Sequence, residues 1–63
     1  MNPDQNLIQS AYQETIQKLF SQLFDGYVTA AGDAGQRQQA EQNFMNGVRT
    51  ARQTRDRAVA LLA

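Results

Sequence analysis

The feature that most limits the fold of this chain is a mismatch in side-chain size between two helical faces. Large apolar residues recur at helical spacing in the first half of the chain, at Ile8, Tyr12, Ile16, Leu19, Phe20, Leu23 and Tyr27. The corresponding stripe of the second half is mostly small, with Ala40, Phe44, Gly47, Val48, Ala51 and Ala58. Because alanine and glycine let two backbones approach closely, the pattern predicts an all-α chain folded as a tight antiparallel two-helix hairpin.

Local signals place the ends of the first helix. Asn2 is a favoured N-cap residue and Pro3 suits the first helical position, so we expect the helix to begin at about residue 3. Gly26 is a possible stop, because glycine is the usual residue just beyond a helix. The apolar stripe nevertheless stays in phase beyond it. We therefore expect one helix over about 3–31, with a kink or a short extra turn at Gly26 as the alternative.

A stronger break follows at residues 32–35, where two glycines flank a capping residue. Asp33 and Gln36 have the spacing of a capping box, so a second helix is expected over about 34–62. Gly47 lies inside its pattern and is interpreted as a site of close contact between the helices. All 63 residues are expected to form a single helical-hairpin domain.

The predicted turn also sets an expected register for the hairpin. If the chain reverses near residue 32, the numbers of facing residues add to about 64, which places Phe20 opposite Phe44. Acidic residues predominate in the first half of the chain and arginines in the second. This division agrees with the hairpin and predicts that Glu14 lies near Arg49 and Arg52.

The chain is too short to build a large core alone, and small domains of this kind gain stability from disulfides, metals or association. It has no cysteine and no histidine, so association is the remaining route. The apolar face of the first helix spans roughly 160°, which is more than one neighbouring helix covers. We therefore expect a homodimer that completes a four-helix bundle. The expected interface core is Ile8, Tyr12, Ile16, Leu19, Phe20, Leu23, Tyr27, Phe44, Val48 and Ala51.

Two groups of polar residues have both a functional and a purely structural interpretation. Gln9 and Arg55 fall on the apolar faces, where they form either a polar layer that fixes register or the ends of a bundle that reach water. The arginines of the second half are Arg37, Arg49, Arg52, Arg55 and Arg57. Arg49 and Arg52 are the candidate phosphate contacts, since they lie about 60° apart on a helix. Alternatively, the arginines interact favourably with the negative C-terminal end of the helix dipole and pair with acidic residues of the first helix.

Nothing in the sequence is typical of catalysis, so no catalytic residue, cofactor or metal site is predicted. The carboxylates are isolated, and Gly26, Gly32 and Gly35 lack the Gly-Lys-Ser/Thr ending of a phosphate-binding loop. Tyr12 and Tyr27 have no histidine beside them and are expected to be core residues with a hydrated hydroxyl. No apolar run approaches the roughly 18 residues of a membrane span, and a signal peptide is not expected. The absence of cysteine is typical of a reducing cytoplasm.

The leading hypothesis is a non-enzymatic protein–protein interaction or assembly module that acts as a homodimeric helical bundle. Apolar residues outside the stripe, such as Leu7, Val28, Met45 and Leu61, are expected to offer contacts to a protein partner. The alternative is a small nucleic-acid-binding regulator that uses the arginine-rich second helix. The zero net charge disfavours this alternative, and salt-dependent binding to RNA or DNA distinguishes the two.

Overall fold

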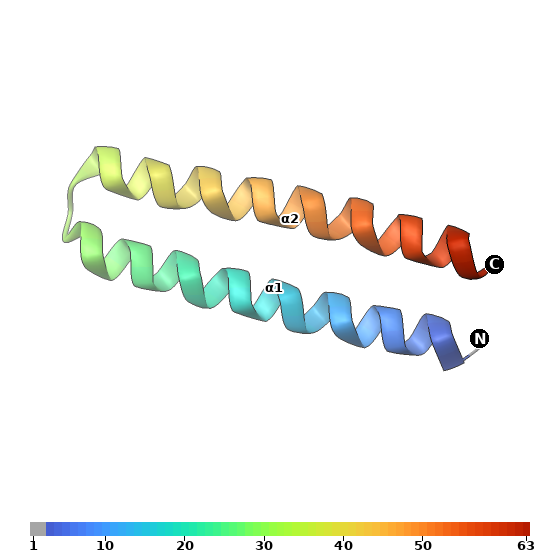
Figure 1. The fold of residues 1–63 in the computed structure, drawn as a ribbon. Helices are drawn as coiled ribbons and strands as arrows, with labels where there is room; N and C mark the ends of the chain where they lie inside the picture. Colours follow the sequence, from blue (N-terminus) through green and yellow to red (C-terminus); the bar gives the residue numbers. More distant parts are fainter. Residues whose placement is uncertain (1–2) are drawn as a thin grey trace.

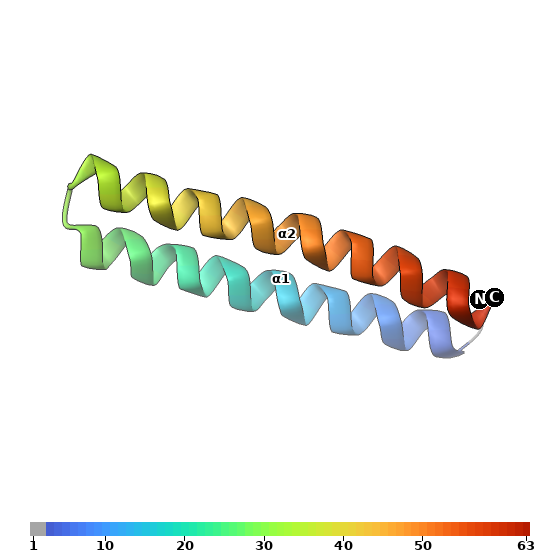
Figure 2. The same ribbon diagram turned by 45° about the horizontal axis from the view of Figure 1, so that its top comes forward.

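The chain folds into two long antiparallel helices joined by a tight turn (Figure 1). The computed structural model describes residues 3–63, and the expected N-cap Asn2 lies outside this range. Helix α1 comprises Pro3–Ala30 and helix α2 comprises Ala34–Leu62. The helices stay side by side when the view is turned (Figure 2), and the hairpin measures 45 × 15 × 10 Å. The prediction of an all-helical chain with two helices packed together is confirmed.

The turn is built from residues whose backbone and side chain both oppose a continued helix. Ala31 and Gly32 have φ angles of 49° and 92°, in the region that favours glycine. Helix α1 therefore ends at Ala30, one residue earlier than expected. Asp33 is the N-cap of α2, and its Oδ1 accepts a hydrogen bond from the Gln36 backbone N–H at 2.9 Å. The structure thus uses the Asp33 cap that the sequence indicated.

Two glycines allow the helices to approach each other closely. Helix α1 runs through Gly26 without interruption. A Cβ atom at Gly26 would lie 2.7 Å from the Cβ of Ala40, and one at Gly47 would lie 2.5 Å from Cδ2 of Leu19. Gly47 is therefore a close-contact site, as the sequence suggested, and Gly26 is a second one. The residue numbers at each of these contacts, Gly26 with Ala40 and Gly47 with Leu19, add to 66, which is two more than the predicted turn implied.

Half-buried residues recur every three or four positions along both helices, the spacing of helices packed at a shallow angle. On α1 the half-buried residues are Gln5, Ile8, Tyr12, Ile16, Leu19, Leu23, Gly26 and Tyr27. On α2 they are Ala40, Phe44, Gly47, Val48, Ala51, Arg55, Ala58 and Val59. Within residues 3–63 only Ala30, 5 % exposed, is buried. The hairpin therefore has a seam between its helices and no closed core.

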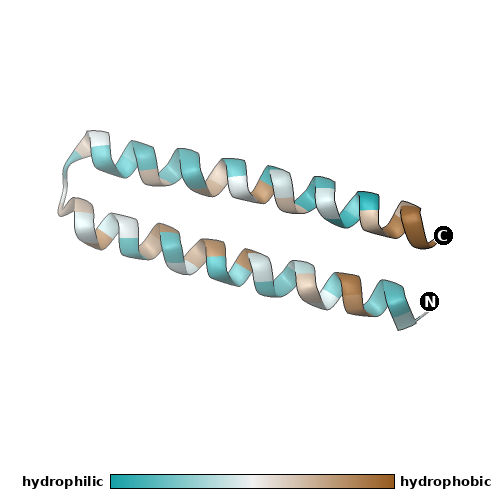
Figure 3. Ribbon diagram, viewed as in Figure 1, coloured by the Kyte–Doolittle hydropathy of each residue, from teal (hydrophilic) through white to brown (hydrophobic). Residues whose placement is uncertain are grey.

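Hydropathy is distributed unequally between the two helices. Apolar segments recur along α1 and return at the C-terminal end of α2, whereas polar residues dominate the first half of α2 (Figure 3). Large apolar side chains remain exposed on both helices, namely Leu7, Phe20, Phe24, Val28, Met45, Leu61 and Leu62. All seven are more than half exposed, so the hairpin leaves large apolar side chains in contact with solvent on both helices.

Candidate interaction faces

The seam between the helices separates two faces of the hairpin that differ in side-chain size. One face holds an open groove of about 570 Å³, lined by Ile8, Ala11, Tyr12, Thr15, Leu19, Asn46, Gly47, Thr50, Ala51, Thr54, Arg55 and Ala58. We call it the small-residue groove. The opposite face carries large residues, Phe20, Phe24, Phe44, Met45 and Val48, which we call the aromatic face.

Helical geometry and one hydrogen bond place the residues of the aromatic face together. At 3.6 residues per turn, Phe20 and Phe24 lie within about 60° of Tyr27 on α1. Met45 and Val48 lie within a similar angle of Glu41 on α2. The Tyr27 hydroxyl donates a hydrogen bond to Oε2 of Glu41, which joins these two sides across the seam. Met45 and Val48 line a shallow groove of about 440 Å³, together with Phe44, Arg49, Arg52, Gln53 and Asp56.

The aromatic face exposes most of its large side chains to solvent. Phe20 is 62 % exposed, Phe24 is 60 % exposed and Met45 is 59 % exposed, whereas Phe44 and Val48 are half-buried at the seam. Phenylalanine, methionine, tyrosine and arginine are the side chains enriched at protein interfaces. The face therefore has the composition of an interface and lacks a cover within its own chain.

Two arginine–tyrosine stacks lie across the seam, one near each end of the hairpin. Cζ of Arg37 lies 4.6 Å from the ring centroid of Tyr27, near the turn. Cζ of Arg55 lies 4.5 Å from the ring centroid of Tyr12, near the open end. Both distances are within the range of a cation–π interaction. The sequence analysis predicted neither stack. The available signal was the sum of the residue numbers in each pair, 64 for Tyr27 with Arg37 and 67 for Tyr12 with Arg55, since facing residues were expected to add to about 64.

Tyr27 is the residue of this region with a shifted pKa. The hydrogen bond to Glu41, then desolvation and the negative charge of Glu41, raise the pKa of Tyr27 above its usual 10.0, while Arg37 opposes the shift. A pKa that is higher in the folded chain means that the stabilisation is present below pH 10.0 and is lost as pH rises through the folded-state value.

This shift predicts a measurable titration. In a Tyr12→Phe variant, phenol absorbance should report Tyr27 alone, with a midpoint above pH 10.0. Glu41→Ala should lower the midpoint, because it removes the acceptor and its charge. Arg37→Gln is the control of opposite sign and should raise the midpoint further. A Tyr27 midpoint unmoved by Glu41→Ala would show that the hydrogen bond does not persist in solution.

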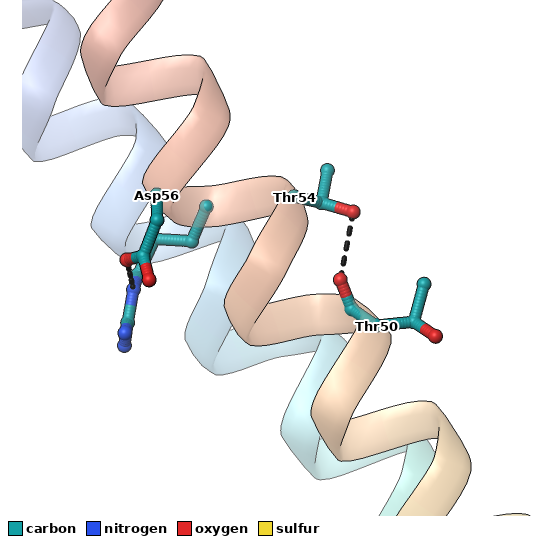
Figure 4. Close-up of polar contacts among 4 residues, drawn as sticks. Thr50, Thr54 and Asp56 are labelled. Carbon is teal, nitrogen blue, oxygen red and sulfur yellow. Dashed lines mark hydrogen bonds and ion pairs between the residues drawn. The ribbon is translucent and has the colours of Figure 1, made fainter.

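The predicted polar layer is placed unequally by the hairpin. Arg55 is half-buried at the seam, where it stacks on Tyr12 and donates from Nε to Oδ1 of Asp56 at 3.0 Å (Figure 4). Gln9 is exposed, on the same side of α1 as Phe20. In the single chain Arg55 therefore stacks on Tyr12. A polar layer that joins Gln9 to Arg55 stays a prediction for an assembly of several chains.

The expected ion pairs between the helices do not form. Within the described residues 3–63 the one ion pair joins the neighbours Arg55 and Asp56 on α2. At 3.6 residues per turn, Glu14 falls at the back of α1, away from the seam. Arg49 and Arg52 instead line the shallow groove on the aromatic side of α2. The observed register is within two residues of the predicted one. The side chains nevertheless point to different faces, so Glu14 and the arginines do not meet.

Two of the three threonines in the small-residue groove, Thr15 and Thr54, satisfy their hydroxyl groups within their own helices. Thr15 Oγ1 donates to the Ala11 carbonyl at 3.0 Å, and Thr54 Oγ1 donates to the Thr50 carbonyl at 2.8 Å (Figure 4). These bonds turn the hydroxyl groups toward the backbone and reduce the polarity of the groove wall. None of the seven large apolar side chains that are exposed in the hairpin lines this groove.

In the described part of the chain, no group of three or more acidic, histidine or cysteine side chains is placed to hold a metal ion. Neither α1 nor α2, over their described residues, has the length and apolar character needed to cross a membrane. Comparison with protein-family models, with curated proteins and with solved structures finds no match to this chain.

Proposed function

We propose that the protein is a non-enzymatic protein–protein interaction or assembly module that acts as a homodimeric four-helix bundle. The observation that carries the proposal is the contrast between one buried residue in the described hairpin and seven exposed large apolar side chains. A chain of 63 residues without disulfides has few other routes to a stable fold. A second hairpin supplies the missing layer and leaves further surface free for a protein partner.

The mass of the protein in solution tests this proposal. Sedimentation equilibrium at micromolar concentrations should give twice the chain mass of 7.0 kDa. A C₂ dimer closes on itself, so the mass should stay at this value as concentration rises further. A mass of one chain throughout the micromolar range would contradict the homodimer.

The second candidate function is nucleic-acid binding, and one observation favours it. Arg49 and Arg52 line the shallow groove on the aromatic side and form no ion pair with the acids of α1. Against it, Arg37 and Arg55 are engaged with tyrosine rings, and the net charge is zero. A surface with two free arginines provides little of the phosphate neutralisation on which such binding depends.

A double substitution distinguishes the two functions. Arg49→Gln with Arg52→Gln should change the free energy of unfolding by no more than about 1 kcal/mol, because both are exposed and form no ion pair. We expect the wild type to show no micromolar binding to RNA or DNA at physiological salt, measured by fluorescence anisotropy. Salt-sensitive binding that the double variant loses while it keeps its fold would put the regulator first.

A further inference from the structure

We propose that two copies of this chain associate through the aromatic face, which leaves the small-residue groove of each copy open to solvent. This inference rests on the proposed homodimer and assigns its interface. The occupant of the aromatic face is a second copy, because the fold of the single hairpin is itself incomplete. Only Ala30 is buried in the described chain, so the face must be covered for the chain to gain a core.

The available area is close to what a stable dimer needs. One broad face of the hairpin, 45 Å by 15 Å between Cα extremes, covers roughly 700 Å², and a standard interface buries about 800 Å² on each partner. Phe20, Phe24 and Met45 are each about 60 % exposed, so together they offer roughly 350 Å² of this area. These three side chains thus account for about half of the area of this face.

Charged groups at the two ends of the aromatic face are paired within the chain, whereas Arg49 and Arg52 beside it form no ion pair in the described residues. Near the turn, Arg37 and Glu41 both contact Tyr27, one over the ring and one at the hydroxyl. Near the open end, Arg55 is paired with Asp56. Each cluster therefore holds one positive and one negative group. In an isologous interface residue i of one copy contacts residue j of the other and the reverse, and a cluster that is balanced within one chain adds little repulsion to such a contact.

The other face is a poorer candidate for the same contact. Seven of the twelve residues that line the small-residue groove are alanine, glycine or threonine, and its large apolar side chains, Ile8, Tyr12 and Leu19, are half-buried at the seam. Large aromatic and methionine side chains contribute most of the apolar area at interfaces. Of the two faces, the aromatic one therefore gains more from a second copy.

Two adjacent residues provide a matched test. Met45 and Asn46 are neighbours in the middle of α2, and both are exposed in the hairpin, but Met45 lies on the aromatic face and Asn46 lines the small-residue groove. Met45→Asp and Asn46→Asp add the same charge to the same helix. We expect Met45→Asp to raise the dimer dissociation constant by about 100-fold, as for a central interface residue. Asn46→Asp should change it by less than about threefold.

A second pair of variants tests the interface without disrupting it. The chain has no cysteine, so Met45→Cys and Asn46→Cys each introduce a single thiol. Alkylation at Met45→Cys should slow as chain concentration rises, and alkylation at Asn46→Cys should not. This comparison stays informative even where Met45→Asp prevents folding.

The outcomes separate this inference from the proposed homodimer. A wild-type chain that stays monomeric would overturn both. A wild-type dimer that Asn46→Asp dissociates and Met45→Asp spares would overturn the assigned face and leave the homodimer standing. Growth beyond the dimer would indicate that the aromatic face of one copy binds the small-residue groove of the next, and it would also overturn the proposal.

Discussion

Gly26→Ala is expected to lower the free energy of unfolding by about 1–3 kcal/mol, the range for overpacking a close contact. The new Cβ would lie 2.7 Å from the Cβ of Ala40, and a methyl group attached directly to the backbone cannot rotate away. The helices must therefore separate at this point. Helix propensity acts in the opposite direction and favours alanine by up to about 1 kcal/mol. The clash is expected to exceed that gain, and chemical denaturation measures the difference.

Gly35→Ala is the matched control for the propensity term. Gly35 also lies within a helix, but a Cβ there would have Asp33 Oδ1 as its neighbour at 3.4 Å, an ordinary contact. This variant should be as stable as the wild type or more stable, by up to about 1 kcal/mol. If Gly26→Ala and Gly35→Ala stabilise the protein equally, the helices do not approach at Gly26 as described.

The second large effect is that of Gly47→Ala on the free energy of unfolding, which is expected to change sign when Leu19 is shortened. A Cβ at Gly47 would lie 2.5 Å from Cδ2 and 3.1 Å from Cδ1 of Leu19, so Gly47→Ala should destabilise the wild type by about 1–2 kcal/mol. Leu19→Ala removes both methyl groups. In that background Gly47→Ala should instead stabilise the protein by up to about 1 kcal/mol, because only the propensity term remains.

The four proteins of this double-mutant cycle measure the contact directly. We expect a coupling free energy between Leu19 and Gly47 of about 1–3 kcal/mol, typical of residues in contact. Leu19→Ala alone also costs stability, and the cycle subtracts that cost. Additive effects, with a coupling below about 0.5 kcal/mol, would show that these two residues do not face each other.

The parts of the fold that depend on local chemistry could be predicted from the sequence. Gly32 and Asp33 marked the turn, because one tolerates positive φ and the other caps the next helix. Gly47 was recognised as a contact site because the helical pattern continued on both sides of it. These features need knowledge of one helix at a time, which periodicity supplies.

The parts that depend on direction around the helix axis were not predictable from matched sequence positions. Glu14 and Arg52 occupy similar levels along the hairpin and yet point to different faces, so the expected ion pair is wrong. Conversely, Arg37 was grouped with the arginines of the second helix and Arg55 was expected in a polar layer or at a hydrated bundle end, and the structure places both over tyrosine rings. For a long side chain, a small difference in direction around the helix axis decides which partner the side chain reaches.

The difference between the two faces was also missed, since the apolar stripe of α1 was treated as one broad surface. The seam divides that stripe. Leu19 and its neighbours pack against α2, while Phe20 and Phe24 turn outward on the aromatic face. The expected interface core therefore mixes residues of two kinds, those that join the helices of one hairpin and those left for another molecule.

The claim that a second copy completes this hairpin is tested most directly by thermal unfolding at a series of chain concentrations. Circular dichroism from about 1 μM to about 100 μM covers the range in which a folding-coupled dimer responds to mass action. We predict that Tm rises steadily with concentration across this range. A Tm that stays constant over the whole series, with full helix content at the lowest concentration, would contradict the claim.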